Sequence, residues 1–304
     1  MTGAAMAPPD ATSADRASAD RARARRAAQL IGRASVEISP RDDPARDRLG
    51  ELLAPGTTVF VNHPGSVTHH DIVAACVRLR RAGFEPVPHV AVRRLASFTQ
   101  ARDFLRRAAG DAAVTSVLLI GGDPAQATGP FRDSANLLAT GLVESHGVGH
   151  VAFAGYPEGH PSVDRRGLDA RLRAKLALAR ERGLATSLVT QFVFEPAPVE
   201  RWLQGLRADG VDCPIRIGVA GPATIATLAK FAVRCGIGAS LRALGRGQTA
   251  FARILAEATP EELIGSLVAA EERGVAIDGL HIFTFGGVRR TAEWMHARAR
   301  GDLF

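Results

Sequence analysis

Three side chains that could do chemistry lie close together near the middle of the chain. Tyr156, Glu158 and His160 offer a phenol, a carboxylate and an imidazole, with prolines and glycines around them. The apolar run before them, residues 151–153, stops at glycine and proline, which is typical of a buried strand that enters a loop. Because Tyr156 is the only tyrosine of a chain with 13 phenylalanines, we predict a polar task for its hydroxyl. The alternative is a proline-rich turn in which Tyr156 and His160 only cap backbone groups.

The elements that must position these residues alternate between short apolar segments and helical patterns. The apolar segments predict strands at residues 34–38, 57–62, 87–92, 114–120, 150–155, 186–194, 215–219 and 280–285. Helices are predicted at 44–53, 71–82, 97–109, 132–143, 164–182, 198–208, within 223–272 and at 289–300. Strands that are apolar on both faces are typical of a buried parallel sheet, and right-handed strand–helix units in this number close into a (β/α)8 TIM barrel. An open doubly wound sheet is the competing α/β fold, but its glycine fingerprint is absent after the first strand.

A barrel of this kind places its chemistry at the carboxyl ends of the strands. The residues at these ends are Glu37, Asn62, His63, His89, Gly121, Gly122, Asp123, Tyr156, His160, Gln191, Gly218 and His281. No metal site is predicted, because the first strand lacks a His-x-His pair. His69 and His70 open a helix, where we expect adjacent side chains to diverge. The sequence also lacks a serine elbow, a GxxxxGK phosphate loop and a strand-end cysteine.

The composition limits the classes of function. The chain has 304 residues, 46% of them apolar, and a formal charge of +7, which favours anionic ligands. One tyrosine, two tryptophans and scattered basic residues do not make a nucleic-acid-binding surface, and no apolar run reaches the ~18–20 residues of a membrane span. Three separated cysteines without a CxxC pair indicate a reducing, cytoplasmic environment.

The two ends of the chain differ in composition. Residues 1–30 form a predicted extension, in which residues 1–15 have the composition of a disordered segment. Alternating alanine and arginine between residues 14 and 33 predict a basic helix. We expect this helix to pack on the body of the protein or on a neighbouring subunit of a homo-oligomer. Residues 31–304 are predicted to form a single barrel domain.

Several strand-end motifs occur together, in one order along the chain. They are Glu37, Pro88-His89, Gly122-Asp123, Tyr156-Pro157-Glu158-x-His160-Pro161, Thr190-Gln191-Phe192 and Leu280-His281-x-x-Thr284. Between about residues 34 and 300 this set resembles the methylenetetrahydrofolate reductase family. The resemblance implies a (β/α)8 barrel that holds FAD at its strand ends. It also implies hydride transfer between NAD(P)H and the folate pair 5,10-methylenetetrahydrofolate and 5-methyltetrahydrofolate.

The resemblance implies roles for individual residues. Glu37 matches the general acid that protonates the folate amine, and burial on the barrel floor is expected to raise its pKa. Asp123 matches a catalytic carboxylate near the flavin and the pterin. The folate-contacting set is Glu37, Asp123, Gln191, Phe231 and Phe283. The flavin-contacting set is Asn62, His63, His89, Ile120, Gly122, Asp123, Tyr156, His160, Asp169 and Lys175, with Lys175 meeting the pyrophosphate as a point charge.

Four positions depart from the family pattern. Gly121 replaces an arginine, Phe283 replaces a tyrosine, and Gly286 and Gly287 replace an asparagine and an arginine. These changes are expected to weaken a flavin phosphate or ribityl contact and to alter the nicotinamide side of the pocket. In this respect the chain is similar to members that oxidise 5-methyltetrahydrofolate in one-carbon catabolism. The alternative function is a non-redox folate- or flavin-binding barrel, acting as a carrier or as a component of a methyl-transfer system.

Overall fold

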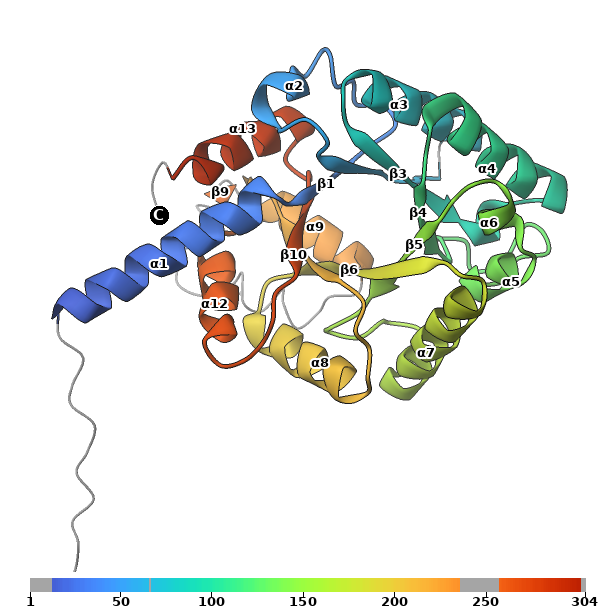
Figure 1. Ribbon diagram of the computed structural model, residues 1–304. Helices are drawn as coiled ribbons and strands as arrows, with labels where there is room; N and C mark the ends of the chain where they lie inside the picture. The colour runs from blue at the N-terminus through green and yellow to red at the C-terminus, as the bar shows by residue number, and fades with distance from the viewer. Residues whose placement is uncertain (1–12, 66, 236–256, 302–304) are drawn as a thin grey trace, which may run out of the picture.

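Eight parallel strands form a closed barrel, in the order β1-β10-β7-β6-β5-β4-β3-β2 (Figure 1). This computed structural model describes residues 13–65, 67–235 and 257–301. The predicted (β/α)8 TIM barrel is confirmed. The barrel strands are β1 Ser35–Ile38, β2 Thr58–Val61, β3 Glu85–Ala91, β4 Ser116–Ile120, β5 His150–Gly155, β6 Ala185–Val193, β7 Ile215–Ala220 and β10 Gly279–Phe283.

Most of the helices surround the barrel on its outer side (Figure 1). Several begin at polar caps that satisfy the free N–H groups of the first turn; Ser97 accepts from the Gln100 N–H, and Asp164 from the Gly167 N–H. The helices are α1 Ser13–Gly32, α2 Leu49–Leu52, α3 His69–Arg81, α4 Phe98–Ala112, α5 Ser134–Ala139, α6 Leu142–Ser145, α7 Arg165–Glu181, α8 Pro196–Ala208, α9 Ile225–Cys235, α12 Glu261–Glu271 and α13 Val288–Ala299. None of the helices in the described part of the chain is long and apolar enough to cross a membrane.

Two predicted helices are interrupted. The helix predicted at 132–143 is divided into α5 and α6, because Gly141 adopts a φ of 74° between them. The helix predicted at 44–53 is reduced to the single turn α2, because Arg48 before it adopts a left-handed φ of 53°. Both interruptions result from a positive φ at one residue, which hydrophobic periodicity does not predict.

Two further elements were not predicted. β3 ends in a turn of 3-10 helix, η1 Val92–Arg94, and a short antiparallel pair joins β8 Ala223–Thr224 to β9 Glu257–Ala258. Some predictions fall outside the described residues: disorder at positions 1–12, and the helical region between 236 and 256.

The predicted N-terminal helix is present as α1, which packs against α12 and α13. Its second half buries Ala27, Leu30 and Ile31, whereas residues 15–22 are exposed and extend beyond the barrel (Figure 1). Arg26 donates to the Glu271 carboxylate at 2.6 and 2.8 Å and to the Ile277 carbonyl at 3.1 Å. The inner half of this helix is therefore part of the packed body.

The barrel interior holds an apolar layer with a polar layer above it. Alternate residues of a strand face the same side of a sheet, so every second residue points into the barrel. Nearer the carboxyl ends of the strands, Glu37, Asn62 and His89 point inward and form the polar layer. The apolar layer is Phe60, Val87, Leu118, Ala152 and Val189, with Ile120 packed against it.

Candidate active site

A buried carboxylate lies at the centre of the polar layer. The Glu37 side chain is 14% exposed, and its Oε2 lies 3.5 Å from the His89 Nε2 and 3.6 Å from the His281 Nε2. Its Oε1 accepts from the Asn62 Nδ2 at 3.3 Å. Neither imidazole Nε2 has a hydrogen-bond partner within the described structure. The strands β1, β2, β3 and β10 thus bring one carboxylate and two imidazoles to one point.

His281 and Ser35 belong to this cluster, although no role was predicted for either residue. His281 is fully buried, and its Nδ1 lies 2.9 Å from the Ser35 hydroxyl. The Phe60 ring packs edge-on against His281 and His89, with centroids 4.8 and 6.1 Å away. A signal was present in the sequence: Ser35 and Glu37 share one face of β1, and barrel closure pairs Ser35 with His281.

The protonation of the cluster differs from the prediction. Burial alone would raise the pKa of Glu37, but the neighbouring His89, His281 and Asn62 outweigh it and hold that pKa below its usual value. The predicted upward shift was therefore wrong, because the sequence did not show that two imidazoles flank the carboxylate. Burial lowers the pKa of His89 to about 4, against the opposing effect of Glu37. His89 is therefore neutral at neutral pH.

An aromatic wall stands beside the carboxylate. The Phe283 ring packs edge-on against His281 at 4.8 Å and stacks on Phe285 at 5.4 Å. Phe285 in turn stacks on Phe231 at 4.1 Å, and Phe192 packs edge-on against Phe283 and Phe285. Phe231 and Phe283, both predicted to contact folate, are thus parts of one aromatic cluster, and Phe285 between them was not predicted.

Gln191 lies at an irregularity in β6. The pairing of β6 with β7 shifts between Val189 and Phe192, which is a bulge around Gln191. The Gly218 N–H donates to the Thr190 hydroxyl at 2.8 Å and fixes this bulge. A side chain at Gly218 would lie 2.5 Å from the Thr190 carbonyl and 2.7 Å from Phe283, so only glycine fits there.

Asp123 lies at the rim of the barrel, where its side chain is 62% exposed. Its carboxylate is 3.7 Å from the Arg94 guanidinium. Gly122, just before it, adopts a φ of 87°, and a Cβ there would lie 2.9 Å from the Ala91 Cβ. Glycine is therefore required for the turn that presents Asp123. Arg94 was not predicted as a site residue.

The segment around Tyr156 and His160 forms a compact loop at the end of β5. The two rings meet edge-on at 5.1 Å, and Gly159 between them adopts a φ of 93°. Arg165 donates to the carbonyls of Tyr156 and Pro157 at 3.0 and 2.7 Å. The Ser162 N–H donates to the His160 Nδ1 at 3.1 Å, so this nitrogen must be an acceptor. Burial, with Arg93 and Arg171 nearby, lowers the pKa of His160.

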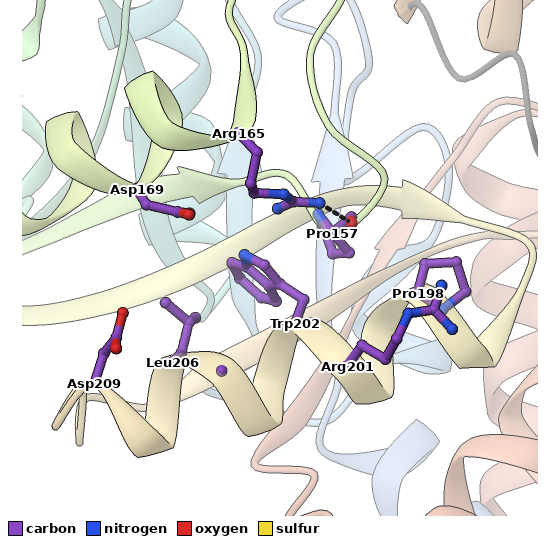
Figure 2. A pocket seen from close by; sticks show the side chains of 9 residues that line it. Pro157, Arg165, Asp169, Pro198, Arg201, Trp202, Leu206 and Asp209 are labelled. Atoms are coloured by element: carbon purple, nitrogen blue, oxygen red, sulfur yellow. Dashed lines mark hydrogen bonds between the residues drawn. The ribbon is translucent and has the colours of Figure 1, made fainter.

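Three of the predicted flavin contacts do not lie in the barrel interior. Asp169 lines a cavity of about 290 Å³ between α7 and α8, with Arg165 and Trp202 among its neighbours (Figure 2). The Lys175 Nζ lies 5.1 Å above the Phe153 ring, beneath α7. His63 points outward and packs edge-on against Phe104 of α4 at 6.4 Å.

One group outside the barrel has the composition of a metal site. Ligand atoms of His69, His70 and Asp103 all lie within 4.8 Å of one another. The predicted divergence of the two histidines was wrong: their ring centroids are 3.9 Å apart, in the first turn of α3. Both His69 nitrogens already face partners, Gln100 and Asp103, and Asp103 also binds Arg106 and Arg107. A cation there would have to displace these bonds.

One known protein family matches the part of the chain that carries most of the strand-end motifs. The family model described as methylenetetrahydrofolate reductase matches residues 45–242, which is more than half of the chain. Among solved structures, a GH128 (subgroup I) endo-beta-1,3-glucanase from Amycolatopsis mediterranei, in complex with laminaripentaose, is 15% identical. That alignment covers 88% of this chain and 99% of that chain, with a TM-score of 0.43, a similarity too low to bear on function. The family match spans β2 to β7 and most of the strand-end residues described above, so the chain belongs to the methylenetetrahydrofolate reductase family.

Proposed function

We propose that this chain is an NAD(P)H-linked oxidoreductase that interconverts 5,10-methylenetetrahydrofolate and 5-methyltetrahydrofolate. The observation that carries the proposal is the Glu37 carboxylate inside the barrel, which lies 3.5 and 3.6 Å from two imidazoles and beside a wall of aromatic rings. The reaction needs a proton at the folate amine and a planar surface for the pterin. This part of the barrel offers both.

Glu37 is the proton donor and acceptor in this proposal. A pterin lying over the carboxylate would exclude water from it, and loss of solvent raises the pKa of a carboxyl group. His281 and Asn62 hold the carboxylate in place, and the Ser35 hydroxyl fixes the His281 ring. His89, neutral at neutral pH, can accept or return a proton at its unpartnered Nε2. The same residues serve both directions of the reaction.

Folate would lie between the aromatic wall and Gln191. Phe231 and Phe283 offer ring surfaces, and aromatic contacts of this kind contribute about 0.5–1.5 kcal/mol beyond the area that they bury. The Gln191 amide can donate and accept at a pterin edge. A phenylalanine at position 283 keeps the ring surface of the family's tyrosine and lacks only its hydroxyl.

FAD, which the family implies, fits the residues at the ends of β4 and β5. The cations Arg93 and Arg171 lie in the surroundings of His160, in the loop that follows β5. Tyr156 and His160 would hold the group from the β5 loop. When bound, FAD supplies the passage of hydride between the nicotinamide and the one-carbon unit.

The glycine at position 286 does not itself argue for the non-redox alternative. A Cβ there would lie 2.0 Å from the Pro222 carbonyl, so close packing excludes any side chain. The glycine is explained by the approach of the segment after β10 to the segment after β7, independently of any ligand.

Product analysis separates the proposal from the alternative. Purified protein is incubated with 5,10-methylenetetrahydrofolate and NADH or NADPH, with and without added FAD, and the folates are separated by chromatography. We expect 5-methyltetrahydrofolate to form in proportion to the nicotinamide oxidised. Binding of folate without conversion in either direction, under all of these conditions, would favour the carrier.

A further inference from the structure

The Arg93 guanidinium occupies the space beside Gly121, at the ends of β3 and β4. Its Nε donates to the Gly121 carbonyl at 3.2 Å, and its Nη2 to the Gly122 carbonyl at 2.7 Å. A Cβ at Gly121 would lie 2.8 Å from that Nη2. The side chain of residue 93 and any side chain on residue 121 therefore compete for one place.

The backbone of Arg93 is fixed from two sides. Its N–H donates to the Gly121 carbonyl at 3.1 Å, and its carbonyl accepts from the N–H and the hydroxyl of Thr128 at 2.9 and 3.0 Å. These bonds fix the backbone from which the Arg93 side chain extends at the rim. A preorganised cation loses less conformational entropy when it binds an anion.

The charge of Arg93 is not neutralised by its surroundings. Its two hydrogen-bond partners are backbone carbonyls, and no carboxylate of the described residues lies within ion-pair distance of it. Arg94, the next residue, is by contrast paired with Asp123. Arg93 and Arg171 both lie in the electrostatic surroundings of the His160 imidazole. A half-buried guanidinium without a carboxylate partner among the described residues is well placed to bind an anionic ligand.

We propose that Arg93 binds the diphosphate of a dinucleotide at the ends of β3, β4 and β5. Arg93 provides from η1 the guanidinium that Gly121 cannot provide from the end of β4. Arginine is suited to this task because its planar fork can hold the loop carbonyls and a phosphate oxygen together. The inference rests on the proposed function, because that function requires a dinucleotide at the barrel mouth.

Two dinucleotides share this chemistry, FAD and NAD(P)H. Calorimetric titrations with inorganic pyrophosphate, FAD, NADH and NADPH, each on protein first shown to be free of flavin, identify which of them Arg93 serves. A titration with 5-methyltetrahydrofolate is the internal control, since it reports on the Glu37 side of the barrel.

Arg93→Met is the main variant, because it keeps the length of the side chain and removes the charge. We expect its affinity for pyrophosphate and for one dinucleotide to fall roughly 10- to 150-fold, with folate affinity unchanged. Arg102→Met, at an exposed position of α4, removes the same charge and is expected to change neither affinity. Gly121→Ala leaves Arg93 in the sequence but forces its guanidinium to move, and should weaken the same ligands.

The controls keep the outcomes distinct. Because Arg93 also holds two loop carbonyls, melting temperatures are measured alongside. If Arg93→Met melts lower, Arg93→Lys decides: lysine retains the charge without the planar fork, so its pyrophosphate affinity should fall clearly less than that of the methionine variant. Equal losses in the lysine and methionine variants, or unchanged affinity for every diphosphate in Arg93→Met, would overturn the role of Arg93. Diphosphate binding through Arg93 without any folate conversion would contradict the proposed function alone.

Discussion

Two sides of the barrel mouth handle charge in opposite ways. On the side of β1, β3 and β10, the Glu37 carboxylate is buried and lies between two imidazoles inside the barrel. At the ends of β3 and β4, the Arg93 guanidinium of η1 is only half buried and contacts the backbone carbonyls of Gly121 and Gly122. The first side surrounds its charge with polar side chains of the barrel, whereas the second has no carboxylate partner for Arg93 among the residues that the structure describes.

This difference separates two tasks. A carboxylate among imidazoles in the barrel interior is suited to moving a proton, because the pKa values of such groups respond strongly to the exclusion of water. An uncompensated cation at a rim is suited to holding an anion. We therefore assign folate chemistry to the Glu37 side and dinucleotide binding to the Arg93 side.

The largest expected effect is on the Glu37 side. Glu37→Gln keeps the shape and the hydrogen bond from Asn62 but cannot exchange a proton, so folate turnover should fall by ~10²–10⁴. Steady-state kinetics and a folate titration on the same protein check this. Folate affinity should change little, and so should pyrophosphate affinity on the other side. Near-normal turnover in this variant would remove Glu37 from the mechanism. The assignment of proton transfer to the Glu37 side would then be wrong.

The second effect is a loss of stability in acid, caused by His89. Its pKa is about 4 in the folded protein, below the ordinary value, so the unfolded chain takes up this proton first. The stabilisation is therefore complete above about pH 6.5 and is lost as the pH falls toward about 4, amounting to about 3 kcal/mol. Urea unfolding across this range should show the loss, with the lowered pKa of Glu37 adding to it at the acid end.

His89→Gln tests the assignment of this acid effect. The variant should flatten the dependence of the unfolding free energy on pH. The remaining slope comes from other groups, such as His63, whose pKa is also lowered by burial. Gln204→Ala, at an exposed position of α8, removes no titratable group and is the control; it should leave the slope as it is. An unchanged slope in His89→Gln would mean that His89 is not held neutral by burial.

Much of the fold followed from local sequence. The strand predicted at 150–155 is β5, and the helix predicted at 164–182 is α7, because an apolar run and an Asp164 cap mark their ends. Glu37, Asn62 and His89 were predicted only as separate strand-end residues, and the structure brings them together inside the barrel. The role of His281 required the closure of the barrel, which joins residues far apart in the chain. Arg93 could not be predicted, because its place depends on the missing side chain at Gly121.

The third effect belongs to the Arg93 side. Tyr156→Phe removes one oxygen from the loop after β5, and should weaken dinucleotide binding by about 1–3 kcal/mol, or roughly 5- to 150-fold. The melting temperature of the protein without added dinucleotide should hardly change. If the hydroxyl instead caps the backbone of a turn, the two results are reversed: a lower melting temperature with unaltered affinity.

The smallest effect concerns the support of the Glu37 cluster. Ser35→Ala removes the 2.9 Å contact to the His281 Nδ1 and should lower folate kcat by about 2- to 10-fold, with KM unchanged. The reason is that His281 would lose the group that sets its orientation toward Glu37. A change in KM alone would place Ser35 in ground-state binding and not in positioning.

Direct reduction of the cofactor by folate tests the central claim, that hydride passes between a folate on the Glu37 side and a dinucleotide on the Arg93 side. Protein loaded with FAD is mixed without oxygen with 5-methyltetrahydrofolate, and the visible absorption of the flavin is followed. We predict that the absorption bleaches and returns when NAD⁺ or NADP⁺ is added. A protein that binds both ligands yet leaves the flavin oxidised, and that forms no 5-methyltetrahydrofolate from NAD(P)H, would contradict the account.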